Sequence, residues 1–281
     1  MRVRGILCDL DGVVYRGEVA CPGAVEGLDG ARKAGVRVLF MTNNASRRPE
    51  VVADQLVSLG VDAEGQDVLT ASQVAATLLA EGLTQGRWEL PESRQVLAVG
   101  GEGVAAALRE RGLDPVSPGR VREQAGRRGS VPAIVVQGYG GALTPPDLSE
   151  IAYALADGAI WIATNDDSTL PTPRGFGLGN GSLIAAVSHA TGRVPDAIAG
   201  KPHPGAYQVA LERLGLVAED CLMIGDRLDT DISGAVAAGI PSALVLTGVA
   251  SAQDAEQAPQ ASRPDHVVHA ITDLEHLWSP R

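Results

Sequence analysis

The sequence predicts an α/β protein with a doubly wound parallel sheet and a second, inserted α/β domain. Short apolar runs rich in Val, Ile and Leu alternate with longer segments whose apolar residues recur at helical spacing. The length of 281 residues suits two modest domains. The predicted strands are residues 5–8, 37–41, 96–99, 134–137, 160–163, 197–199, 221–224, 242–246 and 266–268. The predicted helices are residues 26–34, 49–59, 71–80, 103–111, 148–156, 182–190, 206–214 and 232–238.

Two segments marked by Gly and Pro interrupt this alternation, at residues 82–93 and 191–195. Domain boundaries tend to fall in such linkers. The sequence therefore predicts a discontinuous domain of residues 1–86 and 196–281, with an inserted α/β domain of residues 87–195.

Composition excludes several classes of function. The net charge is −11, from 34 acidic and 23 basic residues, and no basic stripe is present, which excludes a general nucleic-acid binder. No window reaches the roughly 20 apolar residues that span a bilayer. The apolar run Ile6–Cys8 is too short for a secretory signal, and three cysteines cannot form a disulfide framework. We therefore expect no membrane partner and a cytoplasmic location.

The first candidate site lies where the strand of residues 5–8 ends, at Asp9, Asp11 and Gly12. Positions i and i+2 of an extended chain point the same way, so both carboxylates can face one cavity. Open α/β sheets bind ligands at this end of their strands. The alternative is an ordinary Asp-Gly turn.

Two further polar groups follow other strands. Thr42, Asn43 and Asn44 end the strand of residues 37–41, where they can cradle a phosphate or simply cap the next helix. Lys201 follows the strand of residues 197–199 and is one of only two lysines among 23 cationic residues. An ammonium can neutralise a phosphoryl oxygen, and the alternative is a solvated loop lysine.

The last candidate site follows the strand of residues 221–224. Gly225 and Asp226 are followed closely by Asp229 and Asp231. Carboxylates on a strand-end loop suit Mg²⁺, which takes one or two protein carboxylates plus substrate phosphate. Alternatively, Asp231 caps the next helix.

Together these motifs resemble the haloacid dehalogenase superfamily of phosphohydrolases, with Asp9-Leu10-Asp11-Gly12 first, Thr42 second, Lys201 third, and Gly225-Asp226 with Asp231 fourth. The insertion between the second and third motifs is where the superfamily places its α/β cap domain. Details of the motifs look like the branch of NagD and the 4-nitrophenyl phosphatases, and the resemblance covers about residues 6–249. It implies a Rossmann-like catalytic core with a cap, and a phosphoric monoester hydrolase.

The resemblance also implies roles for individual residues. Asp9 would be the nucleophile that forms an aspartyl-phosphate, and Asp11 the general acid and base. Mg²⁺ would be held by the Asp9 carboxylate, the Asp11 carbonyl and Asp226. Thr42, Asn43 and Asn44 would bind the phosphoryl group. Lys201 would offset charge, and Asp231 would orient Lys201 or a metal-bound water.

The substrate implied is a small phosphate monoester. In related caps the loop of residues 163–175 faces the active site, and the run from Asn165 to Ser182 most resembles bacterial glycerol 3-phosphate phosphatases. Leu170 stands where pyridoxal phosphatases carry His, so we expect it to contact substrate and to disfavour pyridoxal phosphate. Phosphoglycolate and nucleotides are alternative substrates. Related proteins often form homodimers through their caps.

Two other functions share part of this chemistry. A phosphotransferase differs only in using an alcohol in place of water, which the sequence does not decide. A phospho-receiver module also holds Mg²⁺ and phosphorylates an Asp, but Asp11 and the inserted domain argue against it.

Charge is unevenly distributed along the chain. Residues 86–195 contain 10 arginines and 11 acidic residues, whereas the remainder contains 13 cationic and 23 acidic residues. The acidic part carries the predicted site, so binding of a phosphate ester there requires a cation.

Overall fold

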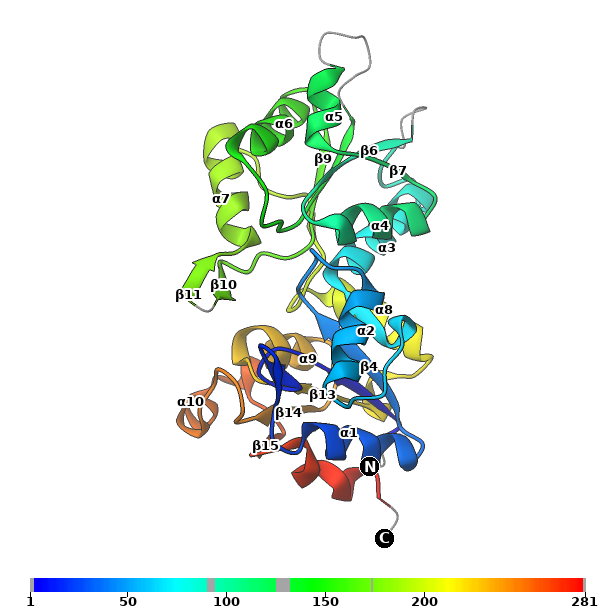
Figure 1. Cartoon of the computed structure of the whole chain (residues 1–281), viewed down its shortest axis with the longest axis vertical. Helices are drawn as coiled ribbons and strands as arrows, with labels where there is room; N and C mark the ends of the chain where they lie inside the picture. Colours follow the sequence, from blue (N-terminus) through cyan, green and yellow to red (C-terminus); the bar gives the residue numbers. More distant parts are fainter. Residues whose placement is uncertain (1–2, 90–93, 125–131, 173, 280–281) are drawn as a thin grey trace. The chain divides into compact units, whose positions relative to one another are not determined.

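The computed structural model describes residues 3–89, 94–124, 132–172 and 174–279 (Figure 1). The chain packs as two compact units. The first contains residues 1–42, 49–69 and 201–281, and the second contains residues 43–48 and 70–200.

The first unit is built on a six-stranded sheet of order β15-β14-β13-β1-β4-β5. Central strand β1 pairs in parallel with β13 and β4, and β14 pairs in parallel with β13 and β15. The strands are β1 (Gly5–Cys8), β4 (Arg37–Thr42), β5 (Val68–Thr70), β13 (Cys221–Gly225), β14 (Ser242–Val245) and β15 (His266–Val268). Strand order reverses beside β1, so the carboxyl ends of β1, β4 and β13 meet at the topological switch point, where such sheets bind ligands.

Helices and short turns connect these strands. They are α1 (Ala24–Lys33), α2 (Pro49–Ser58), α8 (Pro204–Leu214), α9 (Ser233–Ala237), α10 (Ala252–Gln257), the 3₁₀ turns η1 (Gly65–Asp67), η2 (Ala218–Asp220), η4 (Gln260–Ser262) and η5 (Ile271–Leu277), and the π-helical turn η3 (Leu228–Ile232). A small hairpin of β2 (Tyr15–Arg16) and β3 (Val19–Ala20) follows β1.

The core of this unit lies between the sheet and its helices. Ile6 and Cys8 of β1 alternate onto one face, where they join Phe40 of β4 and Leu28 of α1. All four residues of β1 are buried because the sheet is covered on both faces. A rigid central strand therefore carries Asp9 at its end.

The second unit contains a parallel sheet of order β12-β9-β8-β6-β7. Its strands are β6 (Gln95–Val99), β7 (Asp114–Val116), β8 (Ile134–Gln137), β9 (Ile160–Ala163) and β12 (Ala197–Ile198). Its helices are α3 (Ala71–Thr84), α4 (Glu102–Glu110), α5 (Pro118–Glu123), α6 (Pro145–Ala156) and α7 (Asn180–Thr191). Fully buried Trp161 on β9 lies in a separate core with Val135 and Ile184.

The parallel α/β architecture is confirmed, and every predicted strand and helix has a counterpart in the structure. The structure also has elements that the sequence does not predict, namely strands β2, β3, β5 and β7 and helices α5 and α10, and one further segment differs from its predicted state. Within residues 163–175, predicted as a loop, β10 (Thr169–Thr172) pairs with β11 (Gly175–Leu178) in an antiparallel hairpin. Pro171 and three glycines between residues 175 and 179 hide the alternation that would predict strands, but an isolated hairpin tolerates both residue types.

The compact units divide the chain at other positions than the Gly- and Pro-rich segments suggest. Residues 70–86, placed with the first domain by sequence, pack with the second unit, and the return crossing comes at residue 200 rather than 195. The earlier segment 82–93 lies partly outside the described residues. The roles of the two domains stay a prediction. Among the described residues, no helix is both long enough and apolar enough to cross a bilayer.

Candidate active site

Asp9 lies directly after β1 and is held between the two neighbouring strands. Its backbone N–H donates to the Ile224 carbonyl of β13 at 2.9 Å, and the register places Cys8 beside Phe40 of β4. The Asp9 side chain is largely buried. The strand pairing therefore presents this carboxylate at the switch point of the sheet.

Asp11 lies in the turn that follows, and it is exposed. Gly12 donates its N–H to the Tyr15 carbonyl at 2.8 Å and has φ of +85°, a left-handed conformation that glycine adopts without strain. A Cβ atom at Gly12 would overlap the Asp226 carboxylate. The glycine in the first motif is thus required both by the turn and by its approach to Asp226.

Lys201 joins two carboxylates inside the first unit. Its ammonium donates to Asp9 Oδ1 at 2.5 Å and to Asp231 Oδ1 at 2.7 Å, and it lies 3.4 Å from the Met41 carbonyl. Only 3% of Lys201 is exposed. Burial alone lowers the pKa of this ammonium, but Asp231 and Asp9 outweigh it and hold the pKa well above its usual value. Lys201 is therefore charged and fixed.

Asp231 connects Lys201 to the loop after β13. Its Oδ2 atom accepts the backbone N–H of Arg227 at 3.1 Å and that of Asp226 at 3.3 Å. Asp231 itself lies on η3, the π-helical turn that follows the loop. The role of Asp231 in orienting Lys201 stays a prediction, which this ion pair supports. The alternative role as a helix cap is not seen, because the Asp226 and Arg227 N–H groups precede η3 and the residue before α9 is Ile232.

Asp226 follows β13 and is 1% exposed. The Val249 N–H donates to its Oδ2 at 2.8 Å, whereas its Oδ1 is buried and has no hydrogen-bond partner among the described residues. Burial, followed by repulsion from Asp231, raises the pKa of Asp226 to about 6. A buried carboxylate oxygen without a donor is costly unless a cation satisfies it.

Asp9, Asp226 and Asp231 together form a group that fits a metal ion. Carboxylate oxygens of the three lie within 4.8 Å of one another. Burial raises the pKa of Asp9 well above its usual value, and the charges of Asp231 and Asp226 add to this while Lys201 opposes it. Carboxylate oxygens are hard ligands that suit Mg²⁺, and the three carboxylates outnumber the single ammonium of Lys201.

Thr42 is the last residue of β4, the strand that pairs with β1, and it is buried. The next two residues pack in the second unit. The Asn43 amide donates to both carboxylate oxygens of Asp167 at 3.1 Å each. Asn44 Oδ1 accepts the N–H of Ser46 at 2.9 Å and its hydroxyl at 2.7 Å, which makes a local turn and not a helix cap, because α2 begins only at Pro49. Their binding of a phosphoryl group stays a prediction.

Leu170 lies on β10 in the second unit, opposite Gly177 of β11, and is half-buried. Sequence reasoning overlooked three groups that shape the site: Asp167, the Val249 N–H and Tyr207. Asp167 lies in the polar run singled out for the cap, but its partner Asn43 is 124 positions away. A backbone donor such as Val249 leaves no signal in side-chain patterns.

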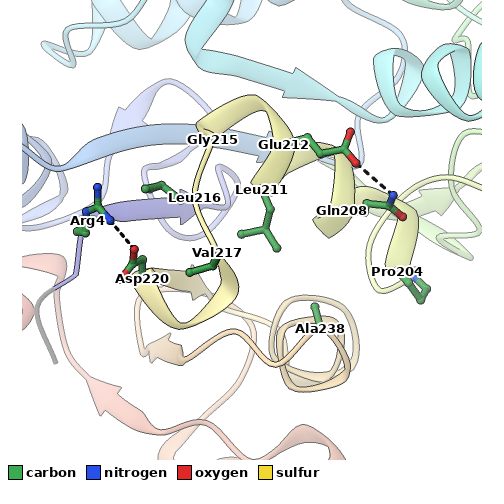
Figure 2. Close-up of a pocket in the computed structure, with 10 residues that line it drawn as sticks. All are labelled: Arg4, Pro204, Gln208, Leu211, Glu212, Gly215, Leu216, Val217, Asp220 and Ala238. Carbon is green, nitrogen blue, oxygen red and sulfur yellow. Dashed lines mark hydrogen bonds and ion pairs between the residues drawn. The ribbon is translucent and has the colours of Figure 1, made fainter.

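A separate hollow of about 570 Å³ opens on the first unit beside α8 (Figure 2). Arg4 and Asp220, which form an ion pair at 2.6 Å on its rim, precede β1 and β13. They therefore mark the amino ends of the strands, whereas Asp9 and Asp226 follow the carboxyl ends. None of the predicted site residues lines this hollow.

Comparison with known proteins places the chain in a family. Residues 6–114 match the haloacid dehalogenase-like hydrolase family, and residues 198–274 match a second, HAD-hydrolase-like family model. D-glycerol 3-phosphate phosphatase of Mycobacterium tuberculosis is 45% identical over 269 residues, which are 96% of this chain and 70% of that protein. The 5′-nucleotidase YutF of Bacillus subtilis is 32% identical, over 99% of this chain and 98% of its own.

Solved structures agree. The glycerol phosphate phosphatase of Mycobacterium tuberculosis in complex with magnesium has a TM-score of 0.85 at 43% identity, covering 100% of this chain and 80% of that one. NagD of E. coli K-12 has a TM-score of 0.82 at 28% identity, covering 97% and 98%. The chain belongs to the haloacid dehalogenase-like hydrolases, in the NagD-like branch, and is a phosphoric monoester hydrolase.

Proposed function

We propose that this protein is a Mg²⁺-dependent phosphatase that hydrolyses glycerol 3-phosphate or a similar small polyol phosphate through an aspartyl-phosphate. One observation carries the proposal: Asp9 is paired with Lys201 beside Asp226, whose Oδ1 has no donor in the described part of the chain. The proposed nucleophile and metal ligand thus follow the carboxyl ends of two adjacent strands, β1 and β13, and the Lys201 ammonium pairs with the nucleophile.

The metal would be held by the carboxylates of Asp9 and Asp226 and the backbone carbonyl of Asp11. The donor set and the unsatisfied Asp226 oxygen support Mg²⁺ at this position. The relative of known structure at 43% identity was crystallised with magnesium. When bound, Mg²⁺ supplies the positive charge that lets an anionic ester approach three carboxylates.

In the first chemical step an Asp9 carboxylate oxygen attacks phosphorus and the ester P–O bond breaks. Asp11 donates a proton to the departing alkoxide, which leaves as an alcohol. Lys201, fixed by Asp231, offsets charge on Asp9 and on the phosphoryl oxygens. The exposed position of Asp11 supports proton exchange with substrate and water.

In the second step water attacks the aspartyl-phosphate. Asp11, now a carboxylate, takes a proton from the water, and the bond between phosphorus and the Asp9 oxygen breaks to release inorganic phosphate. We assign Thr42 and Asn43 to the phosphoryl group, with Asn44 shaping the turn beside them through its contacts with Ser46. Asp167 supports the role of Asn43 because it fixes the amide.

Glycerol 3-phosphate is favoured over other esters because the relative at 45% identity bears that name. The test is a panel of purified-enzyme kcat/KM values for glycerol 3-phosphate, phosphoglycolate, pyridoxal phosphate, a nucleoside monophosphate and 4-nitrophenyl phosphate. We expect glycerol 3-phosphate to rank first. A nucleotide ranking first would instead assign the activity named for the relative at 32% identity.

The same assays separate hydrolysis from transfer. Release of inorganic phosphate that is unchanged by added acceptor alcohols supports a hydrolase, whereas phosphorylated acceptor would indicate a phosphotransferase. Excess EDTA should abolish turnover, and added Mg²⁺ should restore it. Undiminished activity in EDTA would contradict the assignment of Asp226 as a ligand.

We further infer a homodimer formed through the second unit and a cytoplasmic location. Phe176 and Leu178 of the hairpin are 76% and 66% exposed, which supports a protein contact there. Cys8, Cys21 and Cys221 are buried and unpaired, in keeping with a reducing compartment. Size-exclusion chromatography with light scattering measures the mass in solution and tests the dimer. The mass of a monomer would contradict it.

A further inference from the structure

We propose that Tyr207 is a positioning residue that fixes Asp231, and through it both Lys201 and the Asp226 loop. This inference rests on the proposed function. It concerns a residue of α8 that lies outside the four motifs and that touches neither Asp9 nor Asp226 in the hydrogen bonds of the described chain.

The Tyr207 hydroxyl lies in the interior of the first unit, against the turn that carries Asp231. Tyr207 is fully buried, and its hydroxyl lies 3.0 Å from the Thr230 carbonyl and 3.0 Å from the Asp231 carbonyl. A hydroxyl has one proton to donate, so the two carbonyls share it. Both acceptors belong to η3, and Tyr207 therefore ties this turn to α8.

The second step concerns the turn itself. In η3 the Ile232 N–H donates to the Arg227 carbonyl at 3.1 Å, which is a π-helical hydrogen bond. Single π-helical turns are rare in proteins and are frequently found at functional sites. The Tyr207 hydroxyl satisfies carbonyls at the end of this turn, where it passes into α9. Without the Tyr207 hydroxyl, the buried carbonyls of Thr230 and Asp231 lose a hydrogen-bond donor. We expect the turn then to relax towards an α-helical hydrogen-bond pattern.

The third step is packing. Gly234, in the first turn of α9, lies flush against the Tyr207 ring, and a Cβ atom there would overlap the ring and the hydroxyl oxygen. The ring therefore has one place to lie. Close packing fixes the hydroxyl with the precision that a catalytic site needs in its supporting residues.

The fourth step links the turn to catalysis. Asp231 accepts from Lys201 through Oδ1 and from the Asp226 and Arg227 N–H groups through Oδ2. A small rotation of Asp231 consequently moves the ammonium that contacts Asp9 and the backbone that carries Asp226. One lost hydroxyl should impair both chemistry and metal binding, without direct contact to substrate.

The experiment is Tyr207→Phe, which keeps the ring against Gly234 and removes only the hydroxyl. With 4-nitrophenyl phosphate, we expect kcat to fall about tenfold, a loss typical of one buried hydrogen bond, with KM within about twofold. The Mg²⁺ dissociation constant, measured by calorimetry without substrate, should rise about fivefold. Values of kcat and of that constant within twofold of wild type would overturn the proposal.

Two control variants separate positioning from general damage. Tyr153→Phe removes the hydroxyl of a tyrosine that is 62% exposed in the second unit. Gln208→Ala alters the exposed neighbour of Tyr207, which faces the hollow of Figure 2 and donates to Glu212. Both should keep wild-type kinetics. A tenfold loss in Gln208→Ala would show that any disturbance of α8 has this effect, and would overturn the specific role of Tyr207.

A double-mutant cycle tests the route of the effect. Because Tyr207 acts through Asp231, Tyr207→Phe should cost little further kcat in an Asp231→Asn background, whereas additive losses would contradict that route. Should Tyr207→Phe not fold, Gly234→Ala displaces the same hydroxyl with the tyrosine kept, and the same two readouts apply. If wild-type protein hydrolyses no phosphate ester, the proposed function fails, while the calorimetric measurement still decides the link between Tyr207 and the metal site.

Discussion

At the residue scale, the proposed catalytic centre is marked by an excess of negative charge. Three buried carboxylates, Asp9, Asp226 and Asp231, lie close together, and the one ammonium beside them, that of Lys201, pairs with Asp9 and Asp231. Burial and, after it, repulsion from Asp231 raise the pKa of Asp226 to about 6. The polypeptide alone therefore holds the site in an unfavourable state, which a divalent cation relieves.

Asp9→Asn should abolish turnover of every phosphate ester, by at least about 10³-fold, since an amide cannot form the aspartyl-phosphate. The fold should persist, because the variant removes one of the mutually repelling carboxylates. Steady-state assays with circular dichroism melts check both points. Asp229→Asn is a matched control from the Asp226 loop, as Asp229 is exposed and forms an ion pair with Arg227. Wild-type rates in Asp9→Asn would contradict the nucleophile assignment.

Lys201→Met should lower the free energy of unfolding by about 3–5 kcal/mol in the absence of Mg²⁺, because it leaves Asp9 and Asp231 buried without a counter-charge. Urea titrations measure the change. The sequence offers a natural control in its only other lysine, Lys33, which is exposed and pairs with Asp29 on α1. Lys33→Met should change stability little. Equal effects of the two variants would refute the special environment of Lys201.

At the scale of elements, the loops after the strands are shaped by close backbone approach. Gly248, in the segment after β14, lies so near Asp226 that a Cβ atom there would overlap the carboxylate. The neighbouring Val249 N–H holds Oδ2 of the same side chain. Two loops from adjacent strands thus set the direction of one proposed metal ligand, Asp226.

Gly248→Ala should therefore raise the Mg²⁺ concentration for half-maximal activity about tenfold, since Asp226 must rotate to make room. Activity titrated with Mg²⁺ measures this. Gly30→Ala is the control, because Gly30 lies in the interior of α1 with its nearest neighbour atom, Glu275 Oε1, 3.7 Å from the added Cβ. That control should keep the Mg²⁺ requirement and gain about 0.5–1 kcal/mol of stability. An unchanged requirement in Gly248→Ala would show that Asp226 is not restrained there.

The turn after β4 is held in the second unit by the contact between Asn43 and Asp167. Asp167→Ala removes the acceptor of the Asn43 amide and should raise KM for glycerol 3-phosphate about fivefold, leaving kcat within about twofold. Asp167→Asn keeps one carbonyl acceptor for the Asn43 amide, so its KM should lie between those of the wild type and of Asp167→Ala. The exposed Asp157, at the end of α6, provides a control in Asp157→Ala. A large loss of kcat with constant KM would place Asp167 in the chemical step instead.

At the scale of the whole molecule, the two units have separate hydrophobic cores. A ligand of the folded state stabilises the unit that binds it, by about 2.7 kcal/mol at 100 times its dissociation constant. Mg²⁺ should therefore raise the calorimetric transition of the first unit and leave that of the second in place. The shift should vanish in Asp226→Asn. Equal shifts of both transitions would indicate that the units unfold as one.

Most of the fold was predictable because strands buried on both faces appear as uninterrupted apolar runs, as in Gly5–Cys8 and Cys221–Gly225. Acids at the ends of such runs also marked Asp9, Asp226 and Asp231 correctly as neighbours. The hairpin of β10 and β11 was not predictable, since glycines and Pro171 replace the expected alternation.

Other features depend on contacts that residue patterns do not reveal. Tyr207 reads as an apolar position of an amphipathic helix, and nothing local indicates that its hydroxyl reaches η3. The boundary between the units falls between Thr42 and Asn43, inside a single predicted motif. Contacts of Asn43 with Asp167 and Asn165 place it in the second unit, so a boundary drawn from Gly and Pro content lies elsewhere.

This division has a consequence for engineering. The chain passes from one unit to the other four times, and two of the crossings are the peptide bonds after Thr42 and before Lys201. A chimera that receives the second unit of a relative would be joined directly beside both residues. Such exchanges are expected to damage turnover even when each half folds, so libraries that redesign substrate preference are better confined to side chains within residues 70–200.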